Sequence, residues 1–334
     1  MTPTLVRQQL SSTGPVPRVD PSARARDWAE IQERMLVPLY EAVYERLDVG
    51  PGTRLLGLGC GTGLALLMAA SRGAAVTGVE SGAPERLALA RERLLGEGGG
   101  NGTGGAGRGT PAHTDTRLVA GAPGDAVVDT RTPSYTLITA FEPIGGAAGD
   151  TEGLGELLSE ATPLARRGAP VVLVGWGPPE RCVTSKVLRV ASRLADPLPG
   201  SGPGSGSGSG SSSSSGSGSG TGRTGRGAGT GAGARPGTCT ASWRPARRDD
   251  LEEVAQRAGL RPDGSGRVAC PFGYADVDSA VRGLLSTGFF DAAVEATDRM
   301  QVDKEVREAV HPYRRPDGAV WMPNVFRYLI ARTV

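Results

Sequence analysis

The chain has 334 residues, and its 37 Lys and Arg nearly balance its 35 Asp and Glu. The resulting net charge of +2 argues against a protein that binds nucleic acid through a strongly basic face. No apolar run is long enough to span a membrane, and the N-terminal residues contain no apolar segment typical of a secretory signal. We therefore expect a cytoplasmic protein that binds neither nucleic acid nor membrane.

The cysteines and histidines are too few and too scattered to suggest a metal site. Cys60, Cys182, Cys239 and Cys270 form no Cys-x-x-Cys pair, and the chain has only 2 histidines. We expect free thiols and no metal.

Composition divides the chain into one folded domain and two segments unable to form a core. Residues 1–26 mix Pro, Ser, Thr and Arg without an apolar period, which predicts a disordered tail. Residues 197–237 are rich in Gly and Ser, which predicts a disordered insertion. Residues 27–196 and 238–334 then form a single domain, within which a Gly-rich loop is expected at 96–110.

The expected elements begin with a helix and continue as alternating strands and helices. Apolar residues recur every three or four positions from Trp28 to Leu47, the period of an amphipathic helix. Strands are expected at 54–59, 75–79, 117–120, 135–141 and 170–176, with helices at 63–71, 84–95 and 151–165. After the insertion we expect helices at 248–258, 277–285, 291–300 and 304–310, and strands at 268–271 and 324–331. This alternation predicts a parallel sheet covered by helices on both faces.

The most informative segment is the glycine-rich turn that follows the first expected strand. Glycines there let the backbone turn sharply and let a nucleotide-like ligand lie against the main chain. The dinucleotide pattern Gly-x-Gly-x-x-Gly does not fit, because Thr62 or Leu64 stands where the third glycine is required. The pattern that fits is Gly-x-Gly-x-Gly, from Gly59 to Gly63, and Glu80 ends the next strand, where a carboxylate can accept hydrogen bonds from ribose hydroxyls.

These residues resemble the first two motifs of the class I S-adenosylmethionine-dependent methyltransferases. Residues 55–63 look like the first motif and residues 76–80 like the second, and the order of elements from Trp28 to Val334 follows that family. The resemblance implies an α/β, Rossmann-like sheet of seven strands with helices on both faces. Five parallel strands are followed by a helix, a sixth parallel strand and an antiparallel seventh strand between the fifth and sixth.

The resemblance also implies the cofactor, S-adenosyl-L-methionine, and the residues that bind it. Glu80 would hold the ribose hydroxyls, and the remaining cofactor-binding residues would be Leu58, Gly59, Cys60, Gly61 and Gly63. The family usually has an acidic residue where Gly57 stands, and often another after the third strand, where the nearest acid here is Asp125. Losing one charged hydrogen bond weakens binding by roughly ten- to a hundred-fold, so the cofactor site would be weakened without being abolished.

Acceptor and catalytic residues are expected at the carboxyl ends of the strands and on the added helices. Methyl transfer is an in-line displacement that needs alignment and exclusion of water, with a base only if the acceptor must lose a proton. Glu142, directly after the fourth strand, is the best placed base; a solvated loop carboxylate is the alternative. The aromatic residues that could line an acceptor pocket, with core packing as the alternative, are Tyr40, Tyr44, Trp176 and Tyr274.

The sequence thus predicts an enzyme that methylates a small organic acceptor, with oligomeric state left open. The helix at 28–47 and the helical insertion at 277–311 would form a lid that selects the acceptor. One alternative is a methyltransferase-fold protein, weakly active or inactive, that acts as a regulatory or scaffolding subunit, as Gly57 suggests. A nicotinamide-dependent oxidoreductase is a further alternative that the glycine pattern disfavours.

Overall fold

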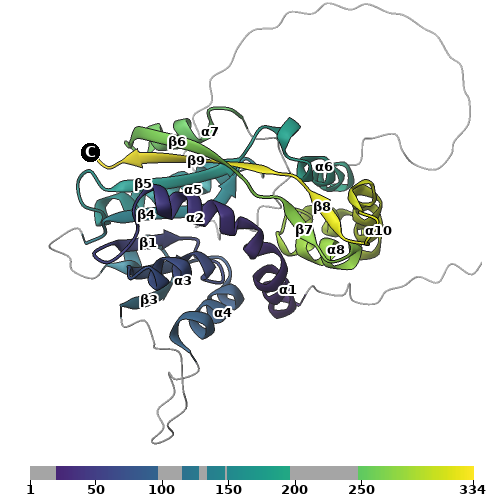
Figure 1. Ribbon diagram of the computed structural model, residues 1–334, viewed down its shortest axis with the longest axis horizontal. Helices are drawn as coiled ribbons and strands as arrows, with labels where there is room; N and C mark the ends of the chain where they lie inside the picture. The colour runs from purple at the N-terminus through teal and green to yellow at the C-terminus, as the bar shows by residue number, and fades with distance from the viewer. Residues whose placement is uncertain (1–19, 97–114, 128–133, 147–148, 196–246) are drawn as a thin grey trace, which may run out of the picture.

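The computed structural model describes residues 20–96, 115–127, 134–146, 149–195 and 247–334. Their centre is a seven-stranded sheet with the order β3-β2-β1-β4-β5-β9-β6 (Figure 1). Its strands are β1 (Arg54–Leu58), β2 (Ala75–Glu80), β3 (Thr116–Ala120), β4 (Leu137–Ile144), β5 (Pro170–Trp176), β6 (Arg261–Ala269) and β9 (Val325–Arg332). Strands β1 to β5 pair in parallel, and β9 lies antiparallel between β5 and β6. The expected fold is therefore confirmed.

Helices cover both faces of this sheet because alternate residues of each strand point to opposite sides. Leu55 joins the apolar cluster under α2 (Val37–Arg46) and α3 (Leu64–Ser71). Leu56, the next residue, joins the cluster under α5 (Asp150–Ala161) and α7 (Asp250–Arg257). Both leucines are fully buried. The sheet is thus the middle of three layers.

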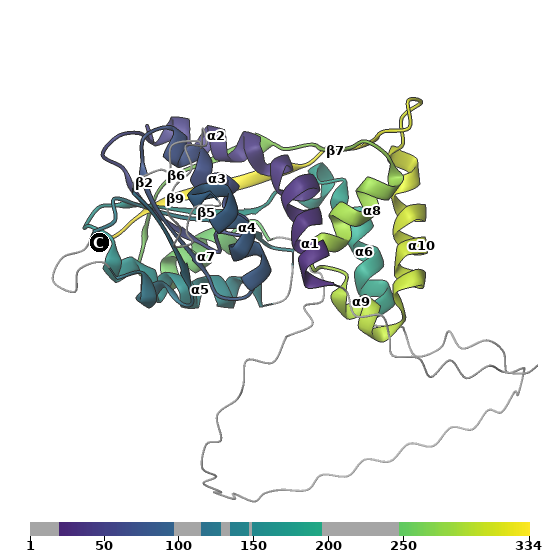
Figure 2. The same cartoon turned by 90° about the horizontal axis from the view of Figure 1, so that it is seen from below.

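A second group of helices lies beyond the carboxyl ends of the parallel strands (Figure 2). It comprises α1 (Pro21–Asp27), α6 (Thr184–Ala195), α8 (Val277–Ser286), α9 (Asp291–Ala296) and α10 (Arg299–Val310), together with a small two-stranded antiparallel sheet of β7 (Phe272–Tyr274) and β8 (Val320–Met322). Helix α4 (Pro84–Leu95) packs against α1, which connects this group to the sheet. This helical group places side chains above the strand ends, where the glycine turn lies.

Two expectations about element boundaries in the N-terminal part are corrected by the structure. The tail was expected to reach residue 26, but α1 begins at Pro21, because the Asp20 side chain caps its N-terminus and Arg24 pairs with Asp291. The helix expected at 28–47 is broken into a π-helical turn (Trp28–Gln32), a 3₁₀ turn (Glu33–Leu36) and α2. Helix α2 can begin where it does because a proline, which has no backbone N–H, is tolerated in the first turn of a helix.

The C-terminal half differs from expectation in the same local way. The short strand expected at 268–271 is the nine-residue β6, whose polar, glycine-containing sequence is held by pairing with β9. The helix expected at 291–300 ends at Ala296, and α10 starts at Arg299 because the Asp298 side chain accepts a hydrogen bond from the backbone of Gln301. Helix α6 and the antiparallel pair of β7 and β8 were not predicted.

Some expectations fall on residues outside the described ranges. These include the insertion at 197–237, residues 97–110 of the Gly-rich loop, and Cys239. Within the described ranges, the helices are all too short or too polar to cross a bilayer. The same residues contain no cluster of three His, Cys, Asp or Glu side chains arranged to hold a metal ion.

Candidate cofactor and acceptor site

The turn between β1 and α3 is held in a backbone conformation that glycine adopts most easily. Gly59, Gly61 and Gly63 have φ values of 57°, 56° and 79°, all in the left-handed region. A Cβ on Gly63 would lie 3.1 Å from the Cβ of Ala90, so this glycine also lets α3 approach α4. The backbone at Gly59 and Gly61 is consequently the part of the turn open to a ligand.

Gly57 is explained by packing of α3 on the sheet. A Cβ there would lie 2.9 Å from Cδ2 of Leu66, inside the core. A carboxylate side chain at this position would have to displace the end of the Leu66 side chain. Packing of α3 on the sheet therefore disfavours the acidic residue that is usual at this position in the family that the sequence resembles.

Glu80 is the last residue of β2, and its side chain contacts the glycine turn. Its carboxylate accepts hydrogen bonds from the backbone N–H of Gly61 at 3.0 Å and of Gly82 at 3.2 Å. Burial, followed by the nearby charge of Glu142, raises the pKa of Glu80 above its ordinary value. The turn and this carboxylate thus form one hydrogen-bonded unit, and the carboxylates gathered there favour a cationic ligand.

A second carboxylate, Glu33, reaches the turn from the N-terminal segment, which runs from the start of α1 to the end of α2 (residues 21–46). It is 3% exposed, accepts hydrogen bonds from the Thr62 hydroxyl and from Nη1 of Arg93 at 2.8 Å, and lies 3.4 Å from the backbone nitrogen of Leu64. This places a negative charge at the N-terminus of α3, where the helix dipole favours it. Glu33 fastens the N-terminal segment over the turn.

Two cavities open beside this unit. A small one of about 40 Å³ is lined by Gly57, Gly59, Gly61 and both Glu33 and Glu142. A larger one of about 630 Å³ extends from Leu58 and Gly59 toward α5 and the helical group, and most of its wall is apolar. Both lie at the carboxyl ends of the parallel strands, the usual ligand position in such sheets.

The structure brings most of the predicted site residues to these cavities. Glu142 lines both, and its Oε2 lies 3.4 Å from where a Cβ of Gly59 would stand. Tyr40 lines the small cavity, and Trp176 lines the large one together with Phe289. Leu58 borders both cavities although it is 2% exposed.

Two predicted acceptor residues lie in the core instead. The hydroxyl of Tyr44 donates to the carbonyl of Ala65 at 2.9 Å, and that of Tyr274 donates to Oε1 of Gln32 at 2.9 Å. Neither tyrosine lines the two cavities, and burial raises the pKa of each hydroxyl. Tyr44 therefore connects α2 to α3, Tyr274 connects β7 to Gln32, and neither is placed to contact an acceptor.

Cys60 borders the small cavity as an unreactive thiol. Burial and the negative charge of Glu80 raise its pKa to about 12, so the sulfur stays protonated at neutral pH. Its role is to fill space beneath Gly78, where an added Cβ would come within 2.9 Å of Sγ.

Sequence reasoning missed Glu33 and the indole of Trp28. The Trp28 ring lies under the guanidinium of Arg86, 4.3 Å from the ring centroid, and borders both cavities. Within the described part of the chain, the buried Nε1 atoms of Trp28 and Trp176 have no hydrogen-bond partner. Nothing in the local sequence marks these residues, because they meet the turn only through the tertiary fold.

No protein-family model and no curated protein matches the chain. Solved structures do match at low identity. A putative methyltransferase from Bacillus halodurans C-125 is 12% identical, with 87% of this chain and 97% of that chain covered and a TM-score of 0.45. The YcgJ protein from Bacillus subtilis is 12% identical, with 88% and 97% covered and a TM-score of 0.46. A geranyl diphosphate C-methyltransferase from Streptomyces coelicolor A3(2) is 14% identical, with 96% and 91% covered and a TM-score of 0.42.

The fold of this chain follows from its own sheet. The order β3-β2-β1-β4-β5-β9-β6, with β9 antiparallel, is that of the class I S-adenosylmethionine-dependent methyltransferase fold.

Proposed function

We propose that the protein is an S-adenosylmethionine-dependent methyltransferase that acts on a small organic acceptor. The observation that carries the proposal is the left-handed glycine turn, locked to Glu80 and opening into the large cavity at the strand ends. Fold alone does not define a reaction, so the proposal rests on this site.

The residues around the turn suit a cationic cofactor. Two carboxylates, Glu33 and Glu142, border the small cavity, and Glu80 is near enough to Glu142 for its pKa to be raised by that charge. Glu33 is paired with Arg93, so Glu142 is the carboxylate available to an ammonium group. We assign to Glu142 the part that an acid at Gly57 would have played.

Within this proposal, the backbone of Gly59 and Gly61 lies against the cofactor, and Glu80 accepts hydrogen bonds from its ribose hydroxyls. Binding beside Gly61 would give the Trp28 Nε1 a partner, because that atom lies 3.7 Å from where a Cβ of Gly61 would stand. A buried donor without a partner costs free energy, so ligand binding would recover it.

S-adenosylmethionine, when bound, supplies an activated methyl group on a positively charged sulfur. The chain's contribution is to align the acceptor with that group and to exclude water. The aromatic rings of Trp176, Phe289 and Phe326 form an apolar wall of the large cavity, suited to an acceptor with an apolar body. Where the acceptor must lose a proton, the exposed Glu142 is placed to accept it.

Calorimetric titration with S-adenosylmethionine and with S-adenosylhomocysteine tests the proposal. We expect micromolar binding by the wild type and a ten- to hundred-fold loss in Glu80→Ala, the effect of about one charged hydrogen bond. Gly61→Val should abolish binding. Its control is Gly52→Val, which also introduces backbone strain, at a φ of 93° and away from the site, and should leave affinity unchanged.

Absence of wild-type binding, or equal losses in Gly61→Val and Gly52→Val, would contradict the proposal. Binding without methyl transfer to any acceptor would favour the alternative, a regulatory or scaffolding subunit. That alternative stays open because Glu80 already accepts hydrogen bonds from the Gly61 and Gly82 backbone, and these use part of its capacity to bind ribose hydroxyls.

A further inference from the structure

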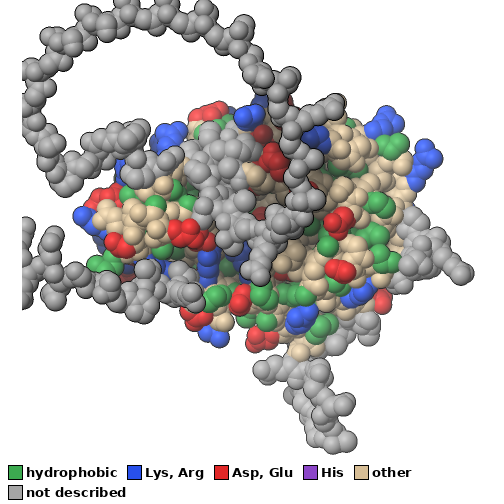
Figure 3. Space-filling model, turned by 180° about the vertical axis from the view of Figure 1, so that it is seen from behind, with side chains coloured by type: hydrophobic (Ala, Val, Ile, Leu, Met, Phe, Trp, Pro, Cys, Tyr) green, Lys and Arg blue, Asp and Glu red, His purple; other side chains and the backbone are tan. Residues whose placement is uncertain are grey.

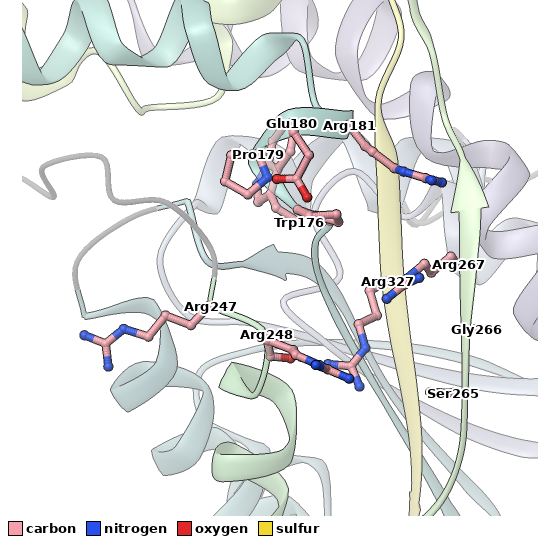
Figure 4. Close-up of a pocket in the computed structure, with 12 residues that line it drawn as sticks. Trp176, Pro179, Glu180, Arg181, Arg247, Arg248, Ser265, Gly266, Arg267 and Arg327 are labelled. Atoms are coloured by element: carbon pink, nitrogen blue, oxygen red, sulfur yellow. The ribbon is translucent and has the colours of Figure 1, made fainter.

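A third cavity, of about 800 Å³, shares Trp176 with the large cavity and is shown in Figure 4. Its wall comes from the end of β5 and the loop after it, the residues just before α7, and the strands β6 and β9. Five arginines line it: Arg181, Arg247, Arg248, Arg267 and Arg327. Glu180 is the one acidic residue among the described residues of this wall.

This gathering of positive charge is local. The whole chain has a net charge of +2, and the coloured part of the face in Figure 3 shows basic and acidic side chains interspersed. In Figure 4 the side chain of Arg247 points away from the others, while Arg181, Arg267 and Arg327 lie along the β6 and β9 side. The effective cluster is therefore Arg181, Arg248, Arg267 and Arg327, hereafter the arginine cluster.

Two members of the arginine cluster oppose each other in the sheet. Arg267 on β6 is the direct cross-strand neighbour of Arg327 on β9. Like charges at directly opposed positions destabilise a pair of strands. Arg327 is compensated, because it donates to both carboxylate oxygens of Glu252 and to the carbonyl of Arg248. For Arg267 and Arg181, the described part of the chain provides neither an ion pair nor a side-chain hydrogen bond.

The glycines in this wall expose the backbone and keep its strands close. A Cβ on Gly266 would lie 2.4 Å from the hydroxyl oxygen of Tyr328, and one on Gly177 would lie 2.4 Å from the carbonyl oxygen of Val325. Arg327 is thus held in place by Glu252, and the neighbouring strand and loop are held close to it. A fixed guanidinium beside two uncompensated ones is an arrangement that favours an anion with several oxygens.

We propose that the arginine cluster binds the phosphate group of a phosphorylated small molecule. A single carboxylate would compensate one guanidinium, whereas a phosphate or diphosphate carries enough charge and oxygens for several. The concave shape and the small net charge of the chain favour a small molecule over a nucleic acid. This site does not depend on the methyl transfer proposed above.

Calorimetric titration of the full chain with inorganic pyrophosphate tests this site, with Arg267→Gln and Arg181→Gln as variants. The matched control is Arg261→Gln, which removes the same charge from an exposed position at the other end of β6. We expect the wild type to bind pyrophosphate with a Kd below about 1 mM. The Kd should rise about tenfold in each cluster variant and stay unchanged in Arg261→Gln.

Three outcomes would overturn the proposal: no pyrophosphate binding by the wild type, an equal loss in Arg261→Gln, or tight binding of single-stranded RNA that depends on the cluster while pyrophosphate binds weakly. Because the readout uses no S-adenosylmethionine, failure of the arginine cluster to bind is separate from failure of the cofactor site.

Discussion

Replacing Glu33 by Gln removes the negative charge that fastens the N-terminal segment to the glycine turn. The carboxylate is 4% exposed and pairs with Nη1 of Arg93 at 2.8 Å, while Arg93 itself is 24% exposed. Removing one partner of a fully buried pair costs about 3–5 kcal/mol, but a partly exposed arginine is resolvated in part. Arg93 also keeps its bond to the Thr62 carbonyl. We therefore expect a loss of about 2 kcal/mol in the free energy of unfolding.

Urea unfolding measures this loss as a shift in midpoint at unchanged slope, and thermal unfolding should show a decrease in Tm of about 4–8 °C for a domain of this size. The matched control is Asp263→Asn, which breaks the exposed pair with Arg332 and should cost less than about 0.5 kcal/mol. Equal effects of the two substitutions would show that Glu33 does not hold the segment, and the reasoning about its buried pair would be refuted.

Three further substitutions separate stability from ligand binding. The pKa of Glu80 is raised above 4.5 in the folded chain, so the stability that this group contributes is complete below that pH and is lost as the pH rises through its folded pKa. Urea unfolding from about pH 4 to about pH 7 should therefore show the wild type losing stability relative to Glu80→Gln. Trp28→Phe removes the unpartnered Nε1 and should weaken S-adenosylmethionine binding in calorimetry about tenfold without lowering Tm. Tyr44→Phe removes the hydrogen bond to Ala65 and should cost about 1 kcal/mol of stability in urea unfolding, with unchanged affinity for the cofactor.

The sheet and the glycine turn were predictable because their signals are local. Each strand of the parallel region is a short apolar run between turn residues, and Gly59 and Gly61 mark positions where the backbone needs a left-handed conformation. The strand at Pro170–Trp176 and the helix at Pro84–Leu95 have the bounds that the sequence indicates. The antiparallel position of β9 came from the resemblance, since no local pattern encodes strand order.

The missed features depend on contacts between distant segments. Nothing around Glu33 distinguishes it from a solvated carboxylate on a helix, and only the packing of its segment on Thr62 and Arg93 buries it. Strand β6 is polar and contains glycines, so its sequence has a weak intrinsic preference for the extended conformation. Pairing with β9 holds it as a strand. The arginine cluster is assembled by the β6–β9 register and two loops, so it too is absent from any local pattern.

A crystal structure of the full chain with S-adenosylhomocysteine would show whether the glycine turn and Glu80 hold the cofactor. We expect the ligand along the backbone of Gly59 and Gly61, with its ribose hydroxyls on Glu80 and its amino group near Glu142. Crystals grown at saturating ligand in which the ligand lies away from the turn, or in which the turn binds no ligand, would show that the proposed cofactor site is wrong.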